Sequence, residues 1–275
     1  MYTQPEKRNA TDRLTLASFT KMKTAGEKIA CLTAYDASFA ALLDHANVDL
    51  VLVGDTLGMV VQGHSSTVPV TVDDVVYHLR MVSRGLTHAY LVGDMPFLSY
   101  MDVPTALRNA GRLMQEGGAR MVKLEGTGAQ AEIVAALAAN GIPVCAHLGL
   151  RPQAVEKLSG FKVQGRGEAA AEQMLDDALS LEQAGADIIL LELIPQKLAG
   201  EITRKVKVPV IGIGAGPDVD GQILVLYDML DITPGRRPKF ARNFMQGAAS
   251  PRAAVEAYVK AVKDGSYPAA EHSFD

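Results

Sequence analysis

The sequence of 275 residues contains no tryptophan, only two cysteines and 5% aromatic residues. Both cysteines, Cys31 and Cys145, lie inside apolar runs, so we expect buried free thiols and no disulfide. Because aromatic rings are few, the 48% of hydrophobic residues predicts a core built mainly from valine, isoleucine, leucine and alanine.

The chain also lacks an apolar run long enough to cross a membrane. The segment Met1–Arg13 is polar and has no apolar stretch of the kind found in secretory signals. The net charge of −4 is small, and aromatic residues are not interleaved with basic ones, which argues against nucleic-acid binding. A small basic cluster, Arg236, Arg237 and Lys239, is interpreted either as a solvated loop or as a subunit contact. We therefore expect a cytoplasmic protein with small-molecule partners.

What the chain has is a series of short apolar runs, six of which end at a polar residue able to take part in chemistry. The runs begin at Ile29, Leu50, Ala89, Met121, Pro143 and Ile188, and they end at Asp36, Asp55, Asp94, Glu125, His147 and Glu192, respectively. Short apolar runs are typical of strands buried on both faces of a parallel sheet. A carboxylate is costly inside such a strand, whereas the carboxyl ends of strands are where α/β enzymes build their sites.

Segments with helical periodicity separate these runs. Helices are predicted over 36–47, 72–85, 104–116, 129–140, 168–184 and 198–206, and a seventh strand over 208–213. Because strands and helices alternate, we predict an α/β fold in which residues 1–275 form a single closed (β/α)8 barrel domain. Met229–Ile232 is the candidate for the eighth strand, and further helices are predicted over 14–24 and 251–263.

Two connecting segments, 56–70 and 149–167, are too long to be simple turns, and we expect both to lie over the carboxyl end of the barrel. Alternating glycines follow the seventh strand at 212–216. Barrels often bind phosphate at this position, but glycine also serves tight turns, so no phosphate is predicted. We expect Gly214 and Gly216 to let a ligand or a loop approach the backbone closely.

Asp55 and Asp94 end neighbouring strands of the predicted barrel. Two carboxylates this close repel each other unless a cation lies between them, and oxygen ligands with open water positions suit Mg²⁺. Either aspartate alone could instead cap the following helix. The two together with Glu125 favour a metal site.

Lys123 and Glu125 are two residues apart on one strand, so both side chains point to the same side. We expect that side to be the lumen, because a charged pair among the helices would be costly. Lys123 could hold a substrate carboxylate, and Glu125 could bind the metal or one of its waters, unless the two side chains simply pair with each other.

His147 could donate a hydrogen bond to a substrate oxygen or tune Glu125. Glu192, in an apolar pocket, would have a raised pKa and could act as a base, the alternative being a helix cap or a surface ion pair.

Nine ordered motifs carry a resemblance to a known family. They are LTAYD (32–36), VGDTLGM (53–59), QGH (62–64), DMPF (94–97), VKLEG (122–126), HLGLRPQ (147–153), KVQGR (162–166), IGIGAG (211–216) and DGQILV (220–225). From about residue 14 to the end, the chain closely resembles the 3-methyl-2-oxobutanoate hydroxymethyltransferase family, which forms ketopantoate in pantothenate biosynthesis.

The resemblance implies a barrel of the phosphoenolpyruvate/pyruvate type that uses Mg²⁺. It also implies that 5,10-methylenetetrahydrofolate donates one carbon to 3-methyl-2-oxobutanoate, giving 2-dehydropantoate. The family is commonly a homo-oligomer, often a decamer.

By the same resemblance, Asp55, Asp94 and Glu125 fall on positions that bind the metal. Asp55, Asp94, Lys123 and Thr56 fall on positions that hold the oxo acid. In the mechanism we expect, His147 would polarise or orient the substrate. The family commonly has serine where this chain has Thr56, and the retained hydroxyl predicts that the contact survives. Glu192 falls on the catalytic base, which would remove the C3 proton to give an enolate stabilised by the metal.

Two rival interpretations stay open. One is a carbon–carbon lyase or mutase of the same superfamily, but such lyases usually present a reactive cysteine on a loop, and both cysteines here lie in predicted strands. The other is a catalytically silent barrel that binds or assembles, which the loss of a site acid would favour. None of the site acids is lost.

Overall fold

The structure is a computed structural model that describes residues 13–233 and 235–275. Eight parallel strands close into a barrel in chain order, with the last strand paired to the first. They are β1 (Ile29–Thr33), β2 (Leu50–Val53), β3 (Tyr90–Asp94), β4 (Met121–Glu125), β5 (Val144–Gly149), β6 (Ile188–Glu192), β7 (Val210–Ile213) and β8 (Gly221–Leu224). All strand residues are buried except Gly149 and Glu192, which end their strands and are partly buried. The predicted (β/α)8 barrel is confirmed.

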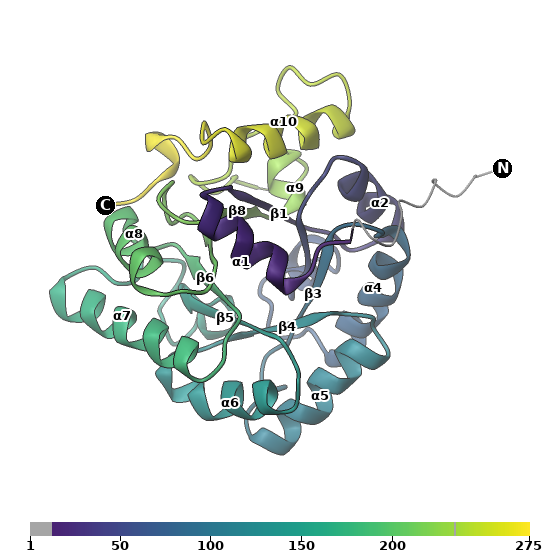
Figure 1. The fold of residues 1–275 in the computed structure, drawn as a ribbon. Coiled ribbons are helices and arrows are strands. Elements are labelled where there is room, and N and C mark those ends of the chain that lie inside the picture. Colours follow the sequence, from purple (N-terminus) through teal and green to yellow (C-terminus); the bar gives the residue numbers. More distant parts are fainter. Residues whose placement is uncertain (1–12, 234) are drawn as a thin grey trace.

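Helices surround the barrel (Figure 1). They are α1 (Leu16–Ala25), α2 (Ala37–His45), α3 (Leu57–Val60), α4 (Val72–Gly85), α5 (Val103–Gln115), α6 (Ala131–Ala139), α7 (Glu168–Gln183), α8 (Gln196–Lys205), α9 (Leu226–Met229) and α10 (Pro251–Lys263). The eight predicted helices agree with these bounds to within two residues. No described helix is long and apolar enough to span a membrane.

The prediction for the eighth strand was wrong. Met229 is the last residue of the short helix α9, and Leu230–Ile232 follow that helix, with the Leu230 N–H donating to Leu226 O at 3.1 Å. The true strand, β8, was hard to recognise because it begins with glycine and carries a glutamine. Gly221 is needed because a Cβ there would lie 2.5 Å from Ile29 O, and the Gln222 amide is buried by donating to Gly216 O at 3.0 Å.

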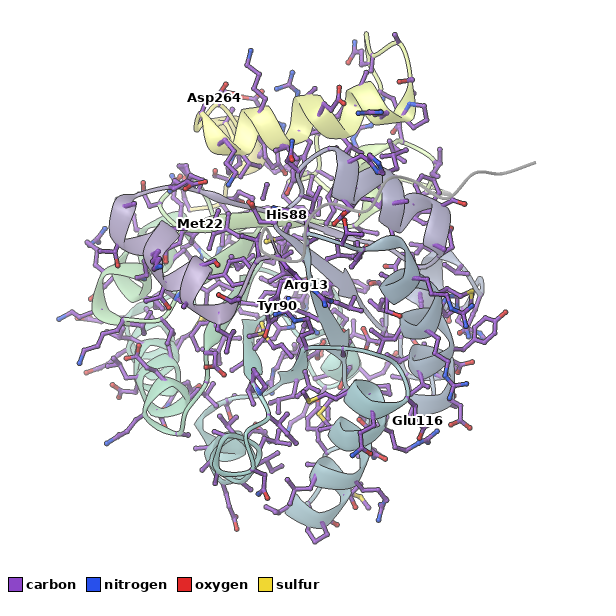
Figure 2. The ribbon with its side chains drawn as sticks, turned by 45° about the vertical axis from the view of Figure 1, so that its right-hand side comes forward. Arg13, Met22, His88, Tyr90, Glu116 and Asp264 are labelled. Carbon is purple, nitrogen blue, oxygen red and sulfur yellow. The ribbon has the colours of Figure 1, made fainter. Side chains whose placement is uncertain are left out.

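The two predicted terminal helices close different parts of the barrel. Helix α1 lies across the amino-terminal end, where Phe19 packs edge-on against Tyr90 at the start of β3 and Lys23 pairs with Asp220 just before β8. This end faces the reader in Figure 1. Figure 2 shows Met22 of α1 and Tyr90 in the interior of the view, and the exposed Glu116 and Asp264 at the periphery.

Helix α10 packs against β1 and α2 (Figure 1). It covers the outside of the barrel there, because α9 is too short to do so. The hydroxyl of its buried Tyr258 lies 2.8 Å from Cys31 O and 2.9 Å from Gln222 O, between the first and last strands. Cys31 and Cys145 are buried free thiols, as predicted. Of the polar segment Met1–Arg13, only Arg13 lies within the described residues.

Candidate active site

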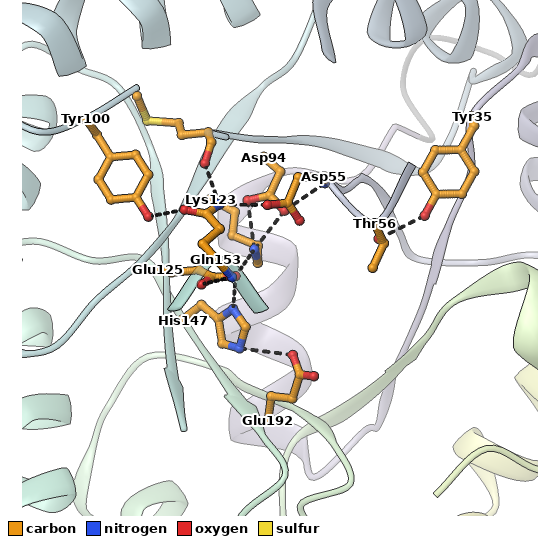
Figure 3. A network of polar contacts seen from close by, with 11 residues as sticks. Tyr35, Asp55, Thr56, Asp94, Tyr100, Lys123, Glu125, His147, Gln153 and Glu192 are labelled. Atoms are coloured by element: carbon orange, nitrogen blue, oxygen red, sulfur yellow. Dashed lines mark hydrogen bonds and ion pairs between the residues drawn. The ribbon is translucent and has the colours of Figure 1, made fainter. Parts of the chain in front are cut away.

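Six predicted site residues converge at the carboxyl end of the barrel, in what we call the cavity floor (Figure 3). Asp55 follows β2, Asp94 ends β3, Lys123 and Glu125 lie on β4, His147 lies on β5 and Glu192 ends β6. The first five residues are at most 5% exposed, and the Glu192 side chain is 15% exposed. All six line one cavity of about 780 Å³, to which both long segments, 56–70 and 149–167, contribute walls as expected.

Asp94 and Lys123 form a buried ion pair at the centre of the floor. Lys123 Nζ lies 2.7 Å and 2.8 Å from the two carboxylate oxygens of Asp94, while its distance to Glu125 Oε1 is 4.0 Å. Burial alone would lower the pKa of Lys123, but the charges of Asp94, Glu125 and Asp55 outweigh it and raise that pKa. Lys123 therefore stays cationic, and its main partner is Asp94 and not Glu125.

Asp55 lies beside this pair, and its backbone N–H donates to Asp94 Oδ2 at 3.2 Å. Burial, together with the nearby charge of Asp94, raises the pKa of Asp55 to about 7. Neither aspartate caps a helix, because Thr56, Thr71 and Asp102 are the N-cap residues of α3, α4 and α5. The helix-cap alternative is therefore wrong for both.

Gln153 is a site residue to which sequence reasoning assigned no role. Its side-chain amide donates to Asp55 Oδ2 at 2.8 Å and to Met95 O at 2.9 Å, and its backbone N–H donates to Glu125 Oε2 at 3.1 Å. Its amide oxygen accepts a hydrogen bond from Tyr100 at 2.6 Å. Gln153 closes the motif 147–153, and its position after Pro152 in a long segment was the only sequence signal.

Glu125 is buried with one oxygen unsatisfied. Its Oε1 has no hydrogen-bond partner and lies 3.7 Å from His147 Nδ1. Burial raises the pKa of Glu125 well above its usual value, which the charge of Lys123 only partly offsets. A buried carboxylate oxygen without a donor is costly, so this atom is available to an incoming ligand.

His147 and Glu192 form the other side of the floor, with His147 Nε2 3.2 Å from Glu192 Oε2. Burial and the charge of Lys123 hold the pKa of His147 well below its usual value, so the imidazole is neutral. Burial raises the pKa of Glu192 to about 8. Glu192 caps no helix, since Pro195 is the N-cap of α8, and the raised pKa is the property expected of a general base.

Thr56 lies at the edge of the floor. Its hydroxyl is 3.0 Å from the hydroxyl of Tyr35, and it lines the same cavity as the acids.

Within residues 13–233 and 235–275, no three His, Cys, Asp or Glu side chains converge closely enough to form a metal site from protein ligands alone. The three-acid set Asp55, Asp94 and Glu125 therefore stays a prediction. Magnesium commonly needs only one or two protein carboxylates and takes its other ligands from water and substrate.

A family model described as ketopantoate hydroxymethyltransferase matches residues 13–270 of the chain. The chain belongs to the ketopantoate hydroxymethyltransferase family. A relative from Alkalilimnicola ehrlichii, named 3-methyl-2-oxobutanoate hydroxymethyltransferase, is 58% identical over 95% of this chain and 94% of its own. A relative of the same name from Nitrosococcus oceani is 56% identical over 95% of this chain and 99% of its own.

Solved structures place this ketopantoate hydroxymethyltransferase family member among related barrels. A phosphonopyruvate hydrolase superposes with a TM-score of 0.58 at 14% identity, covering 76% of this chain and 79% of its own. A 2,3-dimethylmalate lyase of the PEP mutase/isocitrate lyase superfamily gives 0.56 at 15% identity, covering 76% and 80%. At such identities the likeness shows the fold alone, and the family match excludes the lyase and mutase interpretation.

Proposed function

We propose that the chain transfers a hydroxymethyl group from 5,10-methylenetetrahydrofolate to 3-methyl-2-oxobutanoate, giving 2-dehydropantoate for pantothenate biosynthesis. The observation that carries this proposal is that one buried floor holds a cationic amine beside two acids on one side and a base on the other. Lys123 with Asp55 and Asp94 forms the first side, and Glu192 forms the second. This is what deprotonation of a small oxo acid requires, and it agrees with the family of the chain.

The floor residues fit a bound Mg²⁺. Four acids, Asp55, Asp94, Glu125 and Glu192, line the floor together with the single amine of Lys123, and Glu125 Oε1 has no hydrogen-bond partner. Asp55 and Asp94 would hold the cation, with Glu125 binding it directly or through a water. When bound, the cation would supply the positive charge that stabilises an enolate of the oxo acid.

The side chains of the floor would then divide the work. Lys123 would neutralise the substrate carboxylate, and the Thr56 hydroxyl would contact the same substrate. Glu192 would remove the proton from C3, since a base with a pKa near the working pH combines availability with strength. Neutral His147, 3.2 Å from Glu192, would orient the carboxylate of that base or the substrate oxygen. The carbanionic C3 would attack the methylene carbon of the donor, and hydrolysis would release the product.

We further propose that the whole chain is one domain and that it acts in the cytoplasm as a homo-oligomer, a decamer by family resemblance. One continuous hydrophobic cluster from Phe19 to Tyr267 supports the single domain. Exposed apolar side chains support association, because Tyr77, Leu98 and Met101 are 62%, 59% and 67% exposed.

The test is a turnover assay on the purified chain with both substrates and Mg²⁺, with each component then withheld in turn. Formation of 2-dehydropantoate should require the oxo acid and methylenetetrahydrofolate, and chelation of the metal should abolish it. Product formed without the folate, or none under complete conditions, would refute the proposal.

A further inference from the structure

The cavity is larger than its floor. A five-carbon oxo acid needs only the region between Asp55 and Glu192, whereas about 780 Å³ falls in the range of roughly 300–1,000 Å³ that holds ligands of much greater size. Beyond the strand ends, the cavity continues between residues that we call the outer wall: Phe161, Arg236, Lys239, Phe240 and Phe274. The outer wall is aromatic and cationic, in contrast to the acidic floor.

The glycine motif after β7 lets this wall come close to the barrel. Gly214 has a φ of +62°, and a Cβ there would lie 2.9 Å from Phe240 Cδ1. Gly216 has a φ of +79°, and a Cβ there would lie 2.4 Å from the Cβ of Gln196. These glycines therefore make room for two protein segments, as the sequence predicted for a ligand or a loop.

Gln196 in turn holds the final segment of the chain, residues 270–275, which we call the tail. Its backbone N–H donates to Phe274 O at 2.9 Å. Lys239 Nζ donates to Ser273 O at 2.6 Å and lies 4.7 Å from the centre of the Phe274 ring. Arg166 Nε donates to the backbone oxygen of Asp275 at 3.2 Å. Phe274 is thus fixed in the outer wall by contacts to three other segments.

Phe161 lines the same cavity, is 57% exposed and lies in the long segment after β5. Exposed aromatic side chains that border one cavity offer faces on which a flat ring can stack. The exposed Arg236 adds a cation that suits a carboxylate group. The complementary ligand is a planar aromatic molecule with an anionic end.

We propose that the outer wall is the binding site of the second substrate. The pterin and aminobenzoyl rings of the one-carbon donor pack against Phe161, Phe240 and Phe274, and its glutamate carboxylates lie near Arg236. The inference rests on the proposed function, because it assigns the donor to this part of the same cavity. Lys239 acts as a positioning residue that holds the tail.

The proposal is tested by calorimetric binding of tetrahydrofolate and, separately, of 3-methyl-2-oxobutanoate to the full chain with Mg²⁺. Phe274→Ala and Phe161→Ala should each raise the Kd for tetrahydrofolate at least fivefold and change the Kd for the oxo acid less than twofold. Phe161 is exposed, so its replacement tests the proposal even if Phe274→Ala misfolds. Phe97→Ala is the matched control, since Phe97 is 41% exposed and lines a separate hollow, and both Kd values should be unchanged.

Arg236→Gln tests whether Arg236 binds the glutamate carboxylates of the donor, with tetrahydrofolate triglutamate as the probe. The Kd for the triglutamate should rise severalfold at low salt, and the difference in Kd between variant and wild type should shrink at high salt because the attraction is screened.

Unchanged tetrahydrofolate binding in Phe161→Ala would overturn the inference. If the wild-type chain binds no tetrahydrofolate and forms no product, the proposed function itself has failed. If the wild type turns over and Phe161→Ala binds tetrahydrofolate normally, only the placement of the donor is wrong.

Discussion

The two ends of the barrel bury aspartates in opposite ways. At the amino-terminal end, Asp44 accepts four hydrogen bonds, from the backbone N–H groups of Thr87, His88 and Ala89 and from the Thr87 hydroxyl. Although burial alone would raise it, these hydrogen bonds hold the pKa of Asp44 below its usual value. At the carboxyl end, burial and the charge of Asp94 raise the pKa of Asp55 to about 7.

The difference separates a stabilising carboxylate from one held ready for a ligand. Asp44 is satisfied by the chain itself and fixes the entry into β3. Glu125 Oε1 lacks a hydrogen-bond donor and Asp55 lies beside the charge of Asp94, which costs stability until a cation binds. Four predictions test this contrast, from the largest expected effect to the smallest.

Removing a floor aspartate should abolish activity. Asp94→Ala deletes the partner of Lys123 and one of the two proposed metal ligands, so we expect kcat/KM to fall about 10³-fold. Steady-state turnover checks this. Asp73→Ala is the control, because Asp73 is a 79% exposed aspartate that pairs with Arg112 on the surface. Near-normal turnover of Asp94→Ala would remove Asp94 from the site.

Removing the base should separate binding from proton transfer. Glu192→Gln keeps the shape of the side chain, so oxo-acid binding should persist, whereas exchange of the C3 proton with deuterium should slow at least about 10²-fold. Proton NMR in D₂O measures the exchange, and calorimetry measures the binding. Unimpaired exchange would exclude Glu192 as the base.

Replacing the aspartate at the amino-terminal end should lower the free energy of unfolding and leave kcat nearly unchanged. Asp44→Ala leaves four donors without their acceptor, and we expect the free energy of unfolding to fall by about 2–4 kcal/mol. Denaturant unfolding measures the loss. The kcat of the folded fraction should stay within about twofold of wild type, because Asp44 lies at the end of the barrel away from the floor. A large fall in kcat would contradict the division between the two ends.

The smallest effect is a gain in stability. The folded pKa of Asp55, about 7, lies above its unfolded value, so the metal-free wild type loses stability as the pH rises from about 4 to 7. Asp55→Asn cannot ionise, and at pH 8 we expect the metal-free variant to be about 1–2 kcal/mol more stable than wild type, although inactive. The advantage should vanish near pH 4. Thermal unfolding across this pH range with chelator present checks it, and a pH-independent difference would show that the buried charge is not its cause.

Sequence patterns were sufficient to predict the floor because its members end consecutive strands. Asp55, Asp94, Glu125, His147 and Glu192 each follow or end a buried run, and in a parallel barrel those ends must meet. The patterns were insufficient where position depends on tertiary contact. Only the second half of β8 is apolar, since a Cβ at Gly221 would collide with Ile29 O and Gln222 is buried through a hydrogen bond. Gln153 reaches Asp55 across 98 positions of sequence, a contact that no local pattern encodes.

The tyrosine of α10 that bridges the first and last strands has a consequence for synthesis. Tyr258 can reach Cys31 O and Gln222 O only after residues 31–258 have left the ribosome. Until β8 has been made, the edge of β1 lacks its partner strand and could pair with another chain. Sealing of the seam between the first and last strands by Tyr258 therefore waits for the synthesis of α10.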